Sequence, residues 1–453
     1  MARDVLVVDF GVFERARTPA LARRFSGSGV GRYQAKVLNP TWIQAITATT
    51  ATLLAEIDAF IAREVAPLEA DNPQFFDHRR EFARTDTAAG GVPARAWEDL
   101  LGEMVRRADA AGLYRFALPA RLGGSDGANA DMAVIREHLA NKPLGLHSDL
   151  QSEVACVGNF PLVLVLHALG TPEQRELIEP MIRGEVLCGF GLTEPEHGSD
   201  ATWLSTRAVR DGDDWVINGR KRFNTGMHRA HYDLVFARTS GEPGAHRGIT
   251  AFLVPAATPG LEVLYQHWTF NMPSDHAEVA LTDVRVPASA IVGEEGRGLH
   301  SALLFVHENR IRQAASSLGA AQFCVDESVA YARSRTVFGK PLAVNQAIQF
   351  PLVELHTECA LVRELVRATA ERMDANGPLS ASEQVSMCNY RANRLVCDAA
   401  DRAIQVHGGI GYTRAKPFEH IYRHHRRYRI TEGSEEIQIR NVAGHMFGYV
   451  RRG

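Results

Sequence analysis

The chain contains 453 residues, of which 45% are hydrophobic and 23% charged, and its formal net charge is -3. This composition excludes a disordered, a collagenous or a highly charged protein. A net charge close to zero provides no general electrostatic attraction, so we expect neither nucleic acid nor a membrane as a partner. At this length we expect two or three domains, with room for a cofactor between them.

The cysteines and the apolar segments indicate the compartment. None of the six cysteines belongs to a CxxC pair and most have apolar neighbours, so we expect reduced, buried thiols and no bound metal. The longest apolar run, Phe160 to Leu166, is far shorter than the roughly 20 residues of a membrane span. The N-terminal region has no apolar core of the signal-peptide type. These features predict a cytoplasmic protein.

The first part of the chain is predicted to be helical after an N-terminal extension. Residues 1–46 show no sustained hydrophobic period and are assigned to this extension. Over residues 47–187 apolar residues recur at spacings of three and four, as in the series Leu53, Ile57 and Phe60. Such spacing is typical of amphipathic helices that bury one face, so we expect a helical domain here.

Over residues 188–293 the period changes to that of strands. Trp215 to Ile217 is predicted to be a strand that ends in a tight turn at Asn218-Gly219, because Asn-Gly favours the positive φ angles of such turns. Further short strands are predicted at Leu234–Ala237, Ile249–Val254, Leu261–Leu264 and Glu278–Leu281. Their number and spacing predict a small antiparallel barrel or sandwich.

Residues 294–453 return to the helical period. Long helices are predicted over residues 299–334, 341–376, 380–407 and 435–450. Helices of this length, joined by short loops, predict a bundle. The whole chain is therefore predicted to be mainly α, with a central β domain.

Five short segments carry most of the chemical information. Each combines hydroxyl, amide, carboxylate or arginine side chains with glycines that let a ligand approach the backbone. They are Phe190–Asp200, Ile217–Thr225, Arg335–Gln346, Gln405–Tyr412 and Ile430–Gln438. Together and in this order they resemble the signature segments of the acyl-CoA dehydrogenases. The resemblance covers about residues 47–447 and implies an N-terminal helical domain, a middle β-barrel and a C-terminal four-helix bundle.

The resemblance also implies noncovalently bound FAD. Hydroxyl groups and small residues suit the polar edges of a flavin, and arginine provides paired donors for phosphate. The positions expected at the flavin are Phe190, Leu192, Thr193, Gly198, Ser199, Phe223, Thr225, Ser434 and Glu436. The positions expected at the dinucleotide end, partly from a neighbouring subunit, are Arg335, Phe338, Gln346, Gln405, Gly408 and Gly409.

Glu432 is the residue that the resemblance assigns to catalysis. At this position the family has a glutamate that removes the α-proton of an acyl thioester while a hydride leaves the β-carbon. Some relatives carry the base on a helix of the bundle instead, where this chain has Asn309, so the assignment to Glu432 is favoured. The residues expected at the substrate are Ser199, His307, Arg310 and Gly433.

The predicted function is dehydrogenation of an acyl-CoA, as in fatty acid metabolism, by a homotetramer or homodimer that passes electrons to an electron-transfer flavoprotein. Two alternatives stay open: a flavin oxidase or monooxygenase acting on a substrate without CoA, and a noncatalytic flavoprotein that binds a macromolecule. His197, Ser199 and Asp200 are too close in sequence to form a hydrolase triad. The basic segment Arg423–Arg429 is interpreted as a solvated or intersubunit helix face, or as a site for a phosphorylated ligand.

Overall fold

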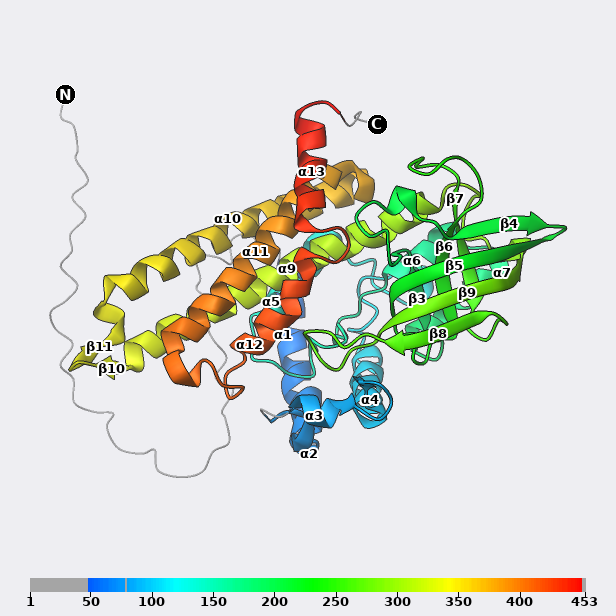
Figure 1. Ribbon diagram of the computed structural model, residues 1–453. Helices are drawn as coiled ribbons and strands as arrows, with labels where there is room; N and C mark the ends of the chain where they lie inside the picture. Colours follow the sequence, from blue (N-terminus) through cyan, green and yellow to red (C-terminus); the bar gives the residue numbers. More distant parts are fainter. Residues whose placement is uncertain (1–47, 78–79, 450–453) are drawn as a thin grey trace. The chain divides into compact units, whose positions relative to one another are not determined.

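The computed structural model describes residues 48–77 and 80–449 (Figure 1). The predicted N-terminal extension, residues 1–46, lies outside the described residues. Among the described residues, no helix is both long and apolar enough to cross a membrane. All six cysteines are free thiols, and five of them are buried, as their apolar neighbours predicted.

Helices form the first part of the described chain. Their apolar faces meet in a core that includes Ile57, Trp97, Met104 and Ile135, which are fully buried. The helices are α1 (Ala48–Phe60), continued by a π-turn at Ile61–Val65, α2 (Ala66–Asp71), α3 (Arg80–Arg84), α4 (Arg95–Ala110), α5 (Asn129–Ala140), α6 (Pro161–Leu169), α7 (Pro172–Arg175) and α8 (Ile178–Ile182). A two-stranded ladder, β1 (Thr85–Asp86) and β2 (Val92–Pro93), separates α3 from α4.

A seven-stranded sheet follows, curled on itself (Figure 1). Its strands are β3 (Cys188–Gly191), β4 (Arg207–Asp211), β5 (Asp214–Thr225), β6 (Tyr232–Arg238), β7 (Ile249–Pro255), β8 (Leu261–Gln266) and β9 (His276–Pro287). They lie in the order β3-β6-β4-β5-β9-β8, with β7 also paired to β6. Most pairs are antiparallel, but β6 runs parallel to β3 and β4. Because β6 is buried on both faces, its sequence is largely apolar rather than alternating.

The predicted turn at Asn218-Gly219 is wrong. β5 runs straight through it, and the pairing with β9 shifts register there instead, as in a β-bulge. The Asn218 side chain holds the irregularity, since its amide donates to Asp283 Oδ1 at 3.0 Å and its carbonyl oxygen accepts from the Asp283 amide at 2.8 Å. The true turn lies before β5, at Gly212, which has φ +63°.

The C-terminal part is a helical bundle around one long helix, α9 (Gly298–Ser334), which packs against α5, α10 and α11 (Figure 1). The remaining helices are α10 (Gln346–Asn376), α11 (Ser382–His407), α12 (Phe418–Arg426) and α13 (Glu435–Met446). Small residues let α9 approach α5 closely: a Cβ at Gly319 would lie 2.2 Å from the Glu137 carbonyl oxygen. A hairpin of β10 (Thr336–Val337) and β11 (Lys340–Pro341) delays the start of α10 beyond the predicted residue 341.

Candidate active site

Glu432 lies in a sharp turn between α12 and α13. It adopts a left-handed conformation with φ +55°, which is uncommon for a residue with a side chain, and Gly433 follows with φ +93°. A Cβ at Gly433 would lie 3.0 Å from both Arg310 Nη2 and Gln438 Nε2, so glycine is required for the close approach. The turn directs the Glu432 side chain toward α9.

Two amides on α9 hold the Glu432 carboxylate. Asn309 Nδ2 donates to Oε1 at 2.9 Å and Gln313 Nε2 donates to the same oxygen at 3.1 Å. The second oxygen, Oε2, is closed to solvent and has no hydrogen-bond partner among the described residues. The carboxylate is therefore fixed through one oxygen and leaves the other free for chemistry.

Burial dominates the proton affinity of this carboxylate. Desolvation, together with the charge of Glu153, raises the pKa of Glu432 to about 8, although Arg310, Asn309 and Gln313 act in the opposite direction. At neutral pH the group holds its proton for most of the time. A carboxyl group that titrates close to the working pH is suited to exchange protons with a weakly acidic carbon.

Arg310 contacts the backbone of the Glu432 turn. Its Nε donates to the Glu432 carbonyl oxygen at 2.9 Å, its Nη2 donates to the same oxygen, and Gln438 Nε2 adds a third donor at 3.2 Å. The structure thus brings together three predicted residues, Arg310, Glu432 and Gly433. His307, one turn earlier on α9, is buried with Nδ1 2.9 Å from the Leu303 carbonyl oxygen, and burial lowers its pKa to about 4.

A second layer of side chains orients Asn309. Asn159 Nδ2 donates to Asn309 Oδ1 at 2.9 Å, which leaves the Asn309 amide group facing Glu432. Asn159 accepts in turn from Arg312, whose Nη2 also forms an ion pair with Glu308 at 3.0 Å. This connected network gives Glu432 a defined position before any ligand binds.

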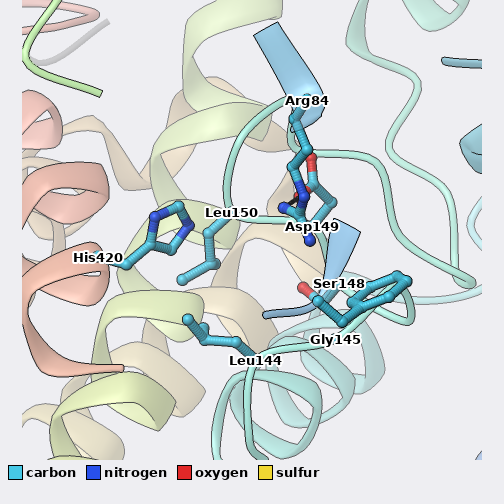
Figure 2. A pocket seen from close by; sticks show the side chains of 8 residues that line it. Arg84, Leu144, Gly145, Ser148, Asp149, Leu150 and His420 are labelled. Atoms are coloured by element: carbon cyan, nitrogen blue, oxygen red, sulfur yellow. Dashed lines mark hydrogen bonds and ion pairs between the residues drawn. The ribbon is translucent and has the colours of Figure 1, made fainter. Parts of the chain in front are cut away.

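A cavity adjoins the two amides that hold Glu432. Its volume of about 40 Å³ is enough for a few water molecules or a small polar group. The lining is mostly polar and includes Arg136, Glu153, Asn159, Arg312, His424 and Tyr428. Ser148, Asp149 and Leu150 separate it from a neighbouring cavity, shown in Figure 2, in which Arg84 and Asp149 face each other.

Two of the segments predicted at the flavin lie side by side. The Arg222 amide donates to the Thr193 carbonyl oxygen at 2.9 Å, so the loop after β3 lies against β5. The buried ion pair of Lys221 with Glu194 at 2.9 Å also joins the two segments. Beside them Phe223 occupies a bulge with φ +66° and projects from the sheet with 49% of its surface exposed.

Exposed residues with hydroxyl groups lie on the same two segments as Phe223. Thr225 is exposed, with Oγ1 3.1 Å from His276 Nδ1, and Gly198 and Ser199 lie exposed in the loop after β3. An added Cβ at Gly198 would meet nothing within 4 Å, so the backbone there is open to a ligand. An exposed aromatic face with hydroxyl groups beside it fits a planar, polar-edged ring.

The remaining residues predicted at the flavin occupy different environments. The Phe190 ring is turned inward and stacks on Phe305 at 4.3 Å, so only its backbone faces the loop after β3. Leu192 accepts from Lys221 Nζ at 3.2 Å through its carbonyl oxygen. Ser434 is the N-cap residue of α13, and Glu436 is exposed in the first turn of that helix, where its charge favours the helix dipole.

The residues predicted at the dinucleotide end form a second group at the far end of α9. The ends of α9 and α11 meet there, since Tyr331 stacks on His407 at 4.3 Å. From Phe305, which touches the flavin segment, to Arg335 is about 45 Å along the helix axis. All six members of the group are exposed: Arg335, Phe338, Gln346, Gln405, Gly408 and Gly409.

The basic segment Arg423–Arg429 is neither a solvated helix face nor an open anion site. His424 and His425 are buried, and burial lowers the pKa of both. Arg427 pairs with Glu153 at 2.6 Å and Arg429 pairs with Glu435 at 2.8 Å. The segment therefore packs inside the fold, with ion pairs that compensate much of its charge.

Other kinds of site find no support in the described part of the chain. His197 Nδ1 lies 2.9 Å from Asp200 Oδ2, but Ser199 takes no part in that pair, so no triad forms. Among residues 48–77 and 80–449, no cluster of His, Cys, Asp and Glu side chains is arranged to hold a metal ion.

Comparison with known proteins places this site in a family. The family models "Acyl-CoA dehydrogenase, middle domain" and "Acyl-CoA dehydrogenase, C-terminal domain" match residues 189–284 and 296–447. A 3-(aryl)acrylate reductase from Clostridium sporogenes is 35% identical over 355 residues, which cover 76% of this chain and 90% of the relative. A caffeyl-CoA reductase-Etf complex subunit from Acetobacterium woodii is 32% identical over 335 residues, 74% of this chain and 86% of the relative.

Solved structures agree with this assignment. The butyryl-CoA dehydrogenase from Megasphaera elsdenii is 26% identical with a TM-score of 0.74, and the match covers 89% of this chain and 99% of that one. A glutaryl-CoA dehydrogenase from Mycobacterium smegmatis in complex with FADH2 is 25% identical with a TM-score of 0.71, covering 89% and 95% of the two chains.

The chain belongs to the acyl-CoA dehydrogenase family. It is an oxidoreductase that acts on acyl-CoA, and its cofactor is FAD. The exposed Phe223 ring and the hydroxyl groups on the same two segments fit the flavin ring. Arg335 forms no ion pair with any described residue, so its guanidinium group is available for the phosphates of FAD.

Sequence reasoning missed the side chains that surround Glu432 and its cavity. The sequence identifies Asn309 only as the position where some relatives carry the base. In the structure its side-chain amide donates to the Glu432 carboxylate. Polar residues repeat at spacings of three and four on α9, at Asn309, Arg312, Gln313 and Ser316, and all four line the cavity. A polar stripe on an otherwise buried helix was the available signal.

Proposed function

We propose that the protein catalyses the FAD-dependent α,β-dehydrogenation of an acyl-CoA thioester to the 2-enoyl-CoA, with Glu432 as the base. The observation that supports this most strongly is the Glu432 carboxylate itself, held through Oε1 by Asn309 and Gln313, with Oε2 buried and free. Burial raises the proton affinity of this carboxylate despite the two amide donors, which favours removal of a proton from the α-carbon.

We assign roles to the other predicted residues from their positions relative to Glu432 and the sheet. Thr193, Ser199, Phe223 and Thr225 would hold the flavin ring, and bound FAD supplies the acceptor for the hydride that leaves the β-carbon. Arg310 would keep the Glu432 turn in place through its donors to the carbonyl oxygen. Its predicted contact with CoA remains part of this proposal.

The reverse reaction is a second candidate, because the raised pKa of Glu432 leaves the carboxyl group protonated at neutral pH. Reduction of a 2-enoyl-CoA needs a proton donor at the α-carbon, and protonated Glu432 would fill that role. Two of the relatives are named as reductases. The base in one direction and the acid in the other are the same group, as microscopic reversibility requires.

The partners are proposed on separate grounds. A relative named as a subunit of a reductase-Etf complex supports an electron-transfer flavoprotein as the redox partner. A second copy of the chain is supported by the exposed group at the end of α9, where Phe338 is fully exposed at the tip of the β10–β11 hairpin. A homodimer or homotetramer would cover it.

The test is anaerobic mixing of the purified, FAD-loaded protein with a panel of acyl-CoA thioesters. We expect at least one thioester to remove the visible absorption of the oxidised flavin. The variant Glu432→Gln is expected to retain FAD and to lose this reduction, because an amide cannot accept the proton. Glu371→Gln, at an exposed position of α10, is the matched control and should react like the wild type.

Failure of every thioester to reduce the flavin would contradict the proposal. Reduction of the Glu432→Gln variant at the wild-type rate would move the base to another residue. Fast reoxidation of the reduced flavin by air, with formation of peroxide or an oxygenated product, would instead support the oxidase or monooxygenase alternative.

A further inference from the structure

The cavity beside Glu432 contains an arginine without an anionic partner. Arg136, on α5, is only 6% exposed and lines this cavity. Its Nη2 donates to the Val157 carbonyl oxygen at 2.9 Å, but its Nε has no partner. Within the described residues no carboxylate lies within 4 Å of its guanidinium group.

The carboxylates around the cavity are already paired with other arginines. Asp149 forms an ion pair with Arg84 at 3.1 Å, and Figure 2 shows the two side chains facing each other. Glu153 binds Arg427 at 2.6 Å. These acids are thus committed elsewhere and leave the charge of Arg136 without a direct counter-ion.

A second guanidinium group faces the same space. Arg312 lines the cavity and is as buried as Arg136, and its Nε also lacks a partner among the described residues. Its ion pair with Glu308 uses Nη2 only. Two buried guanidinium groups with free donors are costly unless a ligand supplies acceptors, and a carboxylate matches their paired donor geometry.

We infer that the acyl group of the substrate ends in a carboxylate, so that the substrate is the CoA monothioester of a short dicarboxylic acid, with Arg136 as the residue that binds the distal carboxylate. The α-carbon would lie at Glu432 while the far end of the acyl group reaches Arg136, with Arg312 beside it. This inference rests on the proposed function and specifies the substrate class of the same site.

The experiment compares pairs of thioesters with the FAD-loaded protein. Succinyl-, glutaryl- and adipyl-CoA are each paired with a neutral isostere in which an isopropyl group replaces the distal carboxylate. We expect kcat/KM to be about 100-fold higher, or more, for the dicarboxylic member of the best pair, because the isostere leaves the buried guanidinium without an acceptor.

Variants assign this preference to one residue. Arg136→Met keeps much of the length of the side chain without its charge and should abolish the preference, while Arg136→Lys should retain part of it. Arg121→Met, at an exposed position of the same helical region, is the matched control and should leave the preference intact. Binding of the matching enoyl-CoA products, followed by the change in flavin absorption, should show the same order without turnover.

The outcomes separate the two proposals. If the neutral thioesters reduce the flavin with the same kcat/KM as the dicarboxylic ones, this inference is overturned and the proposed function stands. If no thioester of either kind reduces the flavin, the proposed function fails first. The comparison of pairs uses the wild-type protein, so it decides the matter even if Arg136→Met does not fold.

Discussion

At the scale of single residues, Glu432 combines three features that rarely occur together in a structural glutamate. Its backbone is left-handed, one carboxylate oxygen is held by two amides, and the other oxygen is buried without a partner among the described residues. Backbone strain and an unsatisfied buried polar atom both lower stability, and they persist where function requires them. The residue was identified from its sequence motif, but this environment became visible only in the structure.

The raised pKa of Glu432 predicts a pH-dependent stability difference. Its pKa is about 8 in the folded protein against an ordinary 4.5, so this group's contribution to stability is complete below pH 4.5 and is lost as the pH rises through 8. Glu432→Gln imitates the protonated group and should not show this loss. Above pH 8 the variant should be more stable than the wild type, by up to about 5 kcal/mol.

Thermal unfolding of both proteins across this pH range measures the effect. The melting temperature of Glu432→Gln should rise relative to that of the wild type as the pH increases. Glu371→Gln provides the comparison for loss of a carboxylate at an exposed site. A difference between Glu432→Gln and the wild type that stays constant with pH would show that the carboxyl group is not perturbed.

At the scale of elements, β5 carries the residues proposed for the flavin, and its shape depends on two irregularities. The register with β9 shifts at Asn218-Gly219 and again at Phe223. Sequence reasoning assigned a turn to Asn218-Gly219, because local propensity favours one there, whereas pairing with β9 overrides that preference. Asn218-Gly219 does mark a backbone irregularity, but pairing with β9 makes this irregularity a bulge instead of a turn.

This arrangement makes Gly219 sensitive to substitution. A Cβ at Gly219 would lie 2.3 Å from Thr206 Oγ1, so Gly219→Ala forces β5 to move. We expect a loss of stability of about 2 kcal/mol or more, with a lower FAD content, because Phe223 lies on the same strand. Gly212→Ala, in the turn before β5, meets nothing within 4 Å and should cost only about 1 kcal/mol.

Thermal unfolding and the ratio of flavin to protein absorption measure both variants. An unchanged FAD content in Gly219→Ala, together with a clear loss of stability, would show that the flavin does not depend on the shape of β5. Equal effects of the two substitutions would contradict the role assigned to the contact with Thr206.

At the scale of the whole molecule, the long helices and the order of elements could be predicted, because hydrophobic periodicity over many residues is a strong signal. The helix predicted over 299–334 matches α9, which spans Gly298–Ser334. The network of Asn159, Arg312 and Asn309 could not be predicted, because it joins residues 150 positions apart in the sequence. Arg136 was missed for the same reason: its lack of an anionic partner is a property of the folded cavity.

The separation of the two proposed cofactor groups predicts complementation between chains. Arg335→Ala should bind less FAD because it lacks the proposed phosphate contact at the far end of α9. Phe223→Ala should bind less FAD because it lacks the proposed flavin contact at the sheet. If each cofactor lies between two chains, a mixed dimer of these variants contains one intact site. Unfolding and refolding the two variants together should therefore restore about a quarter of the wild-type FAD content.

Flavin absorption after refolding, with each variant refolded alone as the control, measures this restoration. A mixture that binds no more FAD than the separate variants would contradict a cofactor site shared between two chains. Restoration of bound FAD without formation of an oligomer, followed by gel filtration, would contradict it equally.

We propose that Glu432 exchanges a proton with the α-carbon of an acyl-CoA thioester. The measurement that tests it most directly is anaerobic rapid mixing of the FAD-loaded protein with the best thioester, with and without deuterium at the α-carbon, over a range of pH. We expect α-deuteration to slow flavin reduction and the second-order rate constant to rise with pH through about 8, where Glu432 loses its proton. A rate constant that is independent of pH in this range and insensitive to α-deuteration would contradict it.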